Sequence, residues 1–158
     1  MTREEKRREV VEACIAHQRQ VADTARKEMD SAQQQSNDYG ANVDRYDSYR
    51  TKMMRARDMY AKQYSNAETS IRYLEDMLRQ PPFATAEHGA VVVTDRQRFF
   101  LSVGVGKFLV PYAPAEGEQQ NVYFAISAQS PIYAALKGRK EGDSFVFNGV
   151  RQTVQEIY

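Results

Sequence analysis

Apolar and polar residues alternate with a different period in each half of the chain. Between residues 46 and 77, mostly small or apolar side chains recur at alternating steps of three and four, the heptad spacing of a helix that pairs with another helix. They are Tyr46, Tyr49, Met53, Ala56, Tyr60, Gln63, Ala67, Ser70, Leu74 and Met77. A weaker row precedes it at Val11, Cys14, Gln18, Val21, Ala25, Glu28 and Ala32, with Ile15, Ala22 and Met29 beside it. Two such rows predict two long helices that pack together.

The segment between the two rows, residues 35–43, is rich in Ser, Asn, Asp and Gly. These residue types favour turns. We therefore expect the chain to fold back there, so that residues 1–80 form an antiparallel coiled-coil hairpin with its tip at about residues 36–46. At about 1.5 Å of rise per residue, each arm would be about 50 Å long.

The second half of the chain has the two-residue period of β-strands and is interrupted by Gly and Pro. All 7 phenylalanines and all 5 prolines lie in residues 81–158. We expect short strands at residues 90–94, 98–103, 107–110, 121–126, 144–147 and 151–157, with Asn148-Gly149 as a tight hairpin turn. One short helix should begin at Ser130-Pro131 and end before Gly138. Residues 81–84 are taken as a linker, and residues 85–158 as a compact α+β domain.

Composition and charge narrow the classes of function. The 158 residues include 22 Lys+Arg and 21 Asp+Glu, a net charge of +1 that does not provide a general basic field for duplex DNA. Any contact with nucleic acid is therefore expected to be indirect, through a partner. One cysteine and 2 histidines exclude a disulfide framework and a Cys/His zinc site. With no long apolar run and no signal-peptide pattern, we expect a soluble cytoplasmic protein without a membrane partner.

One segment carries a resemblance to a known family. The run Ile126-Ser-Ala-Gln-Ser-Pro-Ile-Tyr-Ala-Ala-Leu-Lys-Gly-Arg-Lys-Glu-Gly-Asp-Ser-Phe-Val-Phe147 resembles the C-terminal signature of the GreA/GreB family of bacterial transcription elongation factors. That signature is approximately Ile-Ser-x-x-Ser-Pro-hydrophobic-x-x-x-Leu-hydrophobic-Gly-x-x-x-Gly-Asp, followed by a strand. The predicted order of a long helical hairpin and then a small domain is also similar to the family. Similarity at the level of motifs covers only the C-terminal third.

The resemblance implies an FKBP-like antiparallel-sheet domain that docks on RNA polymerase and a coiled coil that enters the secondary channel of the enzyme. The family's docking mode makes five residues of this segment candidates for partner binding. They are Ser130, Pro131, Lys137, Arg139 and Lys140. In family members that stimulate cleavage of backtracked RNA, two carboxylates at the tip help the polymerase to hold a second Mg²⁺. The resemblance thus implies no intrinsic cofactor, only Mg²⁺ held jointly with RNA polymerase. We expect a monomer without autonomous enzymatic activity.

The tip departs from the family's pattern, which is Asp, then Glu three residues later, then Asn-Ala-Glu-Tyr. If Tyr46 is aligned with the family's tyrosine, the acidic positions fall on Tyr39 and Asn42, and the carboxylate pair is absent. If Asp44 and Asp47 are the pair, both carboxylates are retained, at i and i+3 on one face of a helix. Asp44 and Asp47 are therefore the candidates for catalysis and for binding Mg²⁺.

Structural interpretations of the same acidic residues stay open. Asp44 and Asp47 lie where the second helix should begin, and acids in a first turn complement the helix dipole and cap free amides. Asp38 is a weaker candidate for tip chemistry than Asp44 and Asp47. It also suits a turn beside Gly40.

Three classes of function remain. The first is a polymerase-channel factor, which either stimulates cleavage or only occupies the channel. The second is an FKBP-type prolyl isomerase, which the implied fold alone suggests, and fold does not establish function. The third is a non-enzymatic adaptor that binds another protein through the coiled coil, which the polar positions in the helical rows suggest.

Overall fold

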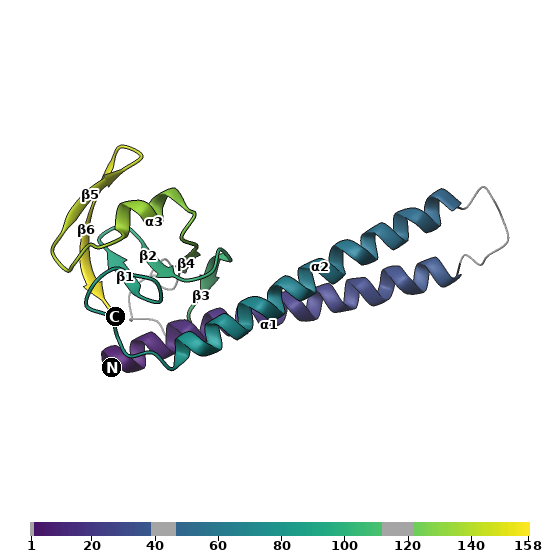
Figure 1. Cartoon of the computed structure of the whole chain (residues 1–158), viewed down its shortest axis with the longest axis horizontal. Coiled ribbons are helices and arrows are strands. Elements are labelled where there is room, and N and C mark those ends of the chain that lie inside the picture. The colour runs from purple at the N-terminus through teal and green to yellow at the C-terminus, as the bar shows by residue number, and fades with distance from the viewer. Residues whose placement is uncertain (1, 39–46, 112–121) are drawn as a thin grey trace. The chain divides into compact units, whose positions relative to one another are not determined.

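The structure is a computed structural model that describes residues 2–38, 47–111 and 122–158. The chain is α+β: a long N-terminal helical region is followed by a six-stranded mixed sheet with one short helix (Figure 1). It divides into two compact units. We call Met1–His17 with Arg72–Tyr158 the base unit, and Gln18–Ile71 the distal unit. The boundary at residues 81–84 stays a prediction.

The two predicted long helices are present. Helix α1 spans Arg3–Asp38 and helix α2 spans Asp47–Leu78. Helix α1 begins with a reciprocal capping box, in which the Glu5 amide donates to Thr2 Oγ1 at 3.2 Å and the Thr2 amide donates to Glu5 Oε2 at 3.0 Å. In the described ranges, no helix combines the length and the apolar character needed to cross a membrane.

In the distal unit, small apolar residues of both helices are buried. They are Ala22, Ala25 and Ala32 of α1, and Ala67 and Ile71 of α2. Hydrogen bonds between described residues join the helices: Arg57 Nη1 donates to Gln33 Oε1 at 2.7 Å, and the Tyr49 hydroxyl donates to Gln35 Oε1 at 3.4 Å. Within this unit the helices therefore lie side by side (Figure 1).

The heptad register predicted from the sequence is wrong at four positions. Val21, Glu28 and Gln63 are exposed and Ser70 is only half-buried, whereas the next residues along, Ala22, Met29, Tyr64 and Ile71, are buried or half-buried. The positions between them, Ala25 and Ala67, stay buried as predicted. The steps between successive inward-facing residues are therefore three and then four, where the prediction had four and then three.

All six predicted strands are present in the base unit. They are β1 (Val91–Thr94), β2 (Arg98–Leu101), β3 (Gly106–Leu109), β4 (Val122–Ile126), β5 (Ser144–Phe147) and β6 (Val150–Ile157), in the order β3-β4-β2-β1-β6-β5. The expectation of a purely antiparallel sheet is wrong, because β2 and β4 pair in parallel, with Phe99 opposite Phe124. Strand β4 lies between β2 and β3 and is antiparallel to β3. Since β3 reverses the direction of β2, β4 has the same direction as β2.

Helix α3, Pro131–Leu136, packs against one face of the sheet (Figure 1). Its buried residues, Ile132, Tyr133 and Leu136, join a core made with Ala86, Ala90, Val92, Phe99, Leu101, Phe145, Val154 and Ile157. Burial and the nearby Glu87 carboxylate raise the pKa of Tyr133. The predicted hairpin turn is confirmed, because Asn148 and Gly149 have φ of 51° and 76°, the positive values that a tight two-residue turn requires.

Replacing Leu136 by Ala should destabilise the base unit by about 3 kcal/mol, because the side chain is fully buried and its loss leaves a cavity. The matched control is Leu109→Ala on edge strand β3, where the leucine is 62% exposed and the expected loss is below about 0.5 kcal/mol. Urea unfolding of both variants measures the difference. Equal midpoints would contradict the packing of α3 against the sheet.

Candidate functional site

Two of the predicted tip residues, Asp38 and Asp47, lie at helix ends. Asp38 is the last residue of α1 and Asp47 is the first residue of α2, so the second helix begins where the acidic residues predicted it. Asp44 lies outside the described residues. The roles of Asp44 and Asp47 in catalysis and in binding Mg²⁺ stay predictions.

Two of the predicted partner-binding residues begin α3. Ser130 is the N-cap and has extended backbone angles of −72° and 137°, but its side chain makes no capping hydrogen bond. The Ser130 carbonyl accepts from the amides of Tyr133 at 3.1 Å and Ala134 at 3.4 Å. Pro131 lies in the first turn, where its missing N–H would have no partner within the helix. The sequence prediction of this helix start is therefore confirmed.

The glycines and the aspartate of the resembling segment shape the loop between α3 and β5. Gly138 and Gly142 have φ of 81° and 91°, which side chains other than glycine rarely adopt. Their amides donate to the carbonyls of Ala86 and Val154, both at 2.8 Å. Asp143 Oδ2 accepts from the Lys140 amide at 2.8 Å and closes the turn. Each of these residues thus has a structural role.

Arg139 is held by contacts within the base unit. Its Nε donates to the Ala135 carbonyl at 3.1 Å, and its Nη1 donates to the Ser144 carbonyl at 3.5 Å. The guanidinium carbon lies 5.8 Å from the centre of the Phe145 ring. This half-buried side chain joins α3 to β5, which reduces its freedom to bind a partner.

Lys137 and Lys140 differ from Arg139 because both are exposed. Lys137 follows α3, and the backbone of Lys140 forms an isolated bridge with Thr85. In the part of the chain that the structure describes, neither ammonium group has an ion pair. These two lysines are the members of the predicted site best placed to contact an acidic surface.

The most deeply buried charged residue of the described chain was not predicted. Arg7 of α1 is 2% exposed. Its Nη1 donates to the carbonyls of Met77 at 2.6 Å and Gln80 at 3.0 Å, and its Nη2 donates to the Gly89 carbonyl at 3.0 Å. Burial lowers the pKa of Arg7. A signal did exist, because Arg7 precedes Val11 and Cys14 at the spacing of the buried row.

Gly89 allows this approach of Arg7. Its φ is 100°, and a Cβ atom added to it would lie 2.6 Å from Gln80 Oε1 and 3.1 Å from Phe83 Cζ. A side chain at this position would therefore push against the residues that surround the guanidinium.

Two surface ion pairs add to the contacts of α1 within the base unit. Arg3 pairs with Glu141 at 2.7 Å, and Lys6 pairs with Glu156 at 2.9 Å. Glu141 Oε1 also accepts from the Ile157 amide at 3.1 Å. Because these groups are partly exposed, each pair adds little to stability compared with the buried Arg7.

Cys14 has no candidate role in catalysis. Its side chain is fully buried, as the heptad row predicted, and burial raises the pKa of the thiol to about 12. At neutral pH the group stays protonated, and the thiol is a poor nucleophile compared with the thiolate.

Replacing Arg7 by Gln should lower the free energy of unfolding by about 3 kcal/mol, because buried carbonyls at the end of α2 and at Gly89 lose their donors. The exposed neighbour Arg8→Gln, with the same change of charge, should stay within about 0.5 kcal/mol. Chemical denaturation followed by circular dichroism tests this. A similar loss in both variants would mean that the effect comes from net charge.

Comparison of the chain with models of protein families, with curated proteins and with solved structures finds no match.

Proposed function

We propose that the chain is a GreA/GreB-like transcription elongation factor. It binds RNA polymerase, inserts its paired helices into the secondary channel, and modulates elongation. Its small domain is FKBP-like, and the protein acts in the cytoplasm as a monomer. Contact with nucleic acid is indirect, through the elongation complex.

One observation carries this proposal. Two long helices, α1 of 36 and α2 of 32 residues, precede a small α+β region whose α3–β5 segment resembles the family's signature. At about 1.5 Å per residue the helices are about 50 Å long, which suits a rod that reaches into a deep channel.

The pairing of the helices supports an antiparallel hairpin. From Gln33 to Gln35 the chain advances along α1, while the bonded partner moves back along α2, from Arg57 to Tyr49. Partners that change in opposite directions are expected of antiparallel helices. The tip of the hairpin would then be the predicted segment at about residues 36–46.

The exposed lysines after α3 support docking on an acidic surface of the polymerase. Lys137 and Lys140 are separated by two residues, and the turn closed by Asp143 fixes the backbone at Lys140. Charges at the rim of an interface mainly accelerate association and make it sensitive to salt. Ser130, Pro131 and Arg139 contribute by holding this surface in shape.

For transcript cleavage, Asp44 and Asp47 would supply hard oxygen ligands to Mg²⁺ held jointly with the polymerase. The polymerase would carry out the hydrolysis, and the factor would have no activity of its own. The second candidate is a regulator that occupies the channel without stimulating cleavage. The departure of the tip from the family's Asp-x-x-Glu pattern favours this alternative.

The first experiment measures shortening of backtracked RNA in a stalled elongation complex. If Asp44 and Asp47 complete the Mg²⁺ site, the wild-type protein should shorten the RNA in an Mg²⁺-dependent manner and Asp44→Ala/Asp47→Ala should not, because the carboxylate ligands are removed. The control Asp23→Ala/Asp30→Ala removes two exposed acids from α1 and should retain full activity. Binding to polymerase without shortening would indicate the channel-occupying regulator. Absence of binding would overturn the proposal and favour an adaptor.

A second experiment measures affinity for RNA polymerase by fluorescence anisotropy. Lys137→Glu/Lys140→Glu should weaken binding about tenfold at low salt, with a smaller effect at high salt, because rim charges are screened. The control Lys107→Glu changes an exposed lysine on β3, at the opposite edge of the sheet from β5, and should bind like the wild type. Equal weakening by both variants would mean that net charge, and not this surface, governs binding.

A further inference from the structure

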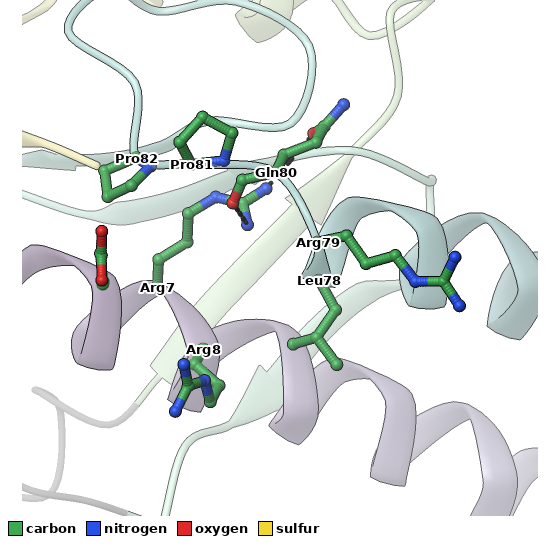
Figure 2. Close-up of a pocket in the computed structure, with 8 residues that line it drawn as sticks. Arg7, Arg8, Leu78, Arg79, Gln80, Pro81 and Pro82 are labelled. Atoms are coloured by element: carbon green, nitrogen blue, oxygen red, sulfur yellow. Dashed lines mark hydrogen bonds between the residues drawn. The ribbon is translucent and has the colours of Figure 1, made fainter.

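A cavity of about 270 Å³ lies in the base unit, next to the buried Arg7. Its walls come from the first turns of α1, with Glu4, Arg7 and Arg8, and from the end of α2 with the segment that follows, including Arg79 and Gln80. Pro81 and Pro82 complete the wall and offer no N–H groups. Figure 2 shows the Arg7 guanidinium beside Gln80 and Pro81, with the Arg8 and Arg79 side chains extending away from it.

The charge of this lining is not balanced. Three arginines and one glutamate give a formal charge of +2. The neighbouring cations Arg3 and Lys6 pair with Glu141 and Glu156. Among the described residues, Arg7, Arg8 and Arg79 have no such carboxylate partner.

Arg7 adds a buried donor without an acceptor. Its Nη atoms are bonded to carbonyl groups, but its buried Nε has no hydrogen-bond partner among the described residues. An unpaired buried donor lowers the stability of the folded state. An anion that enters beside Arg7 would offset part of this cost.

The end of α2 does not prevent an anion from binding. The C-terminus of a helix carries a partial negative charge. Here Arg7 already binds the Met77 and Gln80 carbonyls and so counters that charge. The cavity also borders the N-terminal turns of α1, where the helix dipole is positive.

We propose that this cavity binds a small oxyanion of the phosphate class. Guanidinium groups recognise phosphate oxygens through paired, charge-assisted hydrogen bonds. Arg8 and Arg79 are exposed and long, so they can turn toward an anion held near Arg7. The volume lies below the range of about 300–1,000 Å³ that holds drug-sized ligands, which favours inorganic phosphate or a terminal phosphate group. This site requires no contact with RNA polymerase.

A substitution of Glu4 distinguishes anion binding from a purely structural role of the arginines. Its carboxylate lines the same cavity and repels an anion. Glu4→Gln should therefore tighten binding, whereas loss of arginines should weaken it. Opposite effects of the two changes are expected only if an anion occupies the cavity.

The experiment titrates the full chain with inorganic phosphate by calorimetry, at ionic strength held constant with chloride. We expect a dissociation constant of about 1 mM or tighter. Arg8→Gln/Arg79→Gln should bind at least about tenfold more weakly, and Glu4→Gln about threefold more tightly. The control Arg96→Gln/Arg151→Gln removes two exposed arginines elsewhere in the base unit and should bind like the wild type.

Titrations with other phosphate compounds identify the source of the phosphate group. Tighter binding of pyrophosphate or ATP than of phosphate would support a site for phosphate-bearing metabolites, and the reverse would support free phosphate. Equal weakening by the control variant would overturn the proposal, because binding would then reflect net charge. Binding of a single-stranded RNA without binding of any small phosphate would also overturn it.

Discussion

The packing of the base unit depends on one buried cation. Arg7 enters from α1 and binds carbonyl groups at the end of α2 and at Gly89, just before β1. Carbonyl groups in the last turn of a helix have no intrahelical donors, so they need partners from elsewhere in the chain. A guanidinium group suits them because it offers five donors in a fixed plane. It thereby joins three segments that are distant in the sequence. Gly89, whose positive φ would be strained in a residue with a side chain, and the cavity both lie beside this guanidinium.

The two units use different packing along the same helices. In the base unit, Val10, Val11 and Ile15 of α1 and Leu74 of α2 are buried. In the distal unit, the fully packed positions are mostly alanines, and a hydrogen bond between Arg57 and Gln33 adds a polar link. Alanine buries less apolar area than valine or leucine, so each turn of the distal unit gains less free energy from burial. Tertiary contacts in the base unit therefore contribute most of the stability of the helices.

Several motif residues of the resembling segment have structural roles that do not depend on function. Pro131 begins α3, Gly138 and Gly142 adopt positive φ, and Asp143 closes a turn. These motif positions are explained by the fold, so an isomerase, an adaptor or a polymerase factor could all retain them. Function must instead depend on the exposed side chains that the motif positions orient. Lys137 and Lys140 are exposed side chains of that kind, and for this reason the proposed binding experiment changes them and leaves the glycines intact.

Local chemistry in the sequence determined the elements of this protein. Heptad spacing predicted α1 and α2, alternation predicted six strands, and Ser130-Pro131 with Gly138 predicted both ends of α3, because these signals act within a few residues. Only the tertiary structure decided which faces pack and which strands pair. Tyr64 and not Gln63 faces inward because the partner helix determines which face is covered, and β2 paired in parallel with β4 because β4 lies between β2 and β3. The burial of Arg7 likewise depended on carbonyl groups about 70 to 80 residues away, and no local pattern specifies such partners.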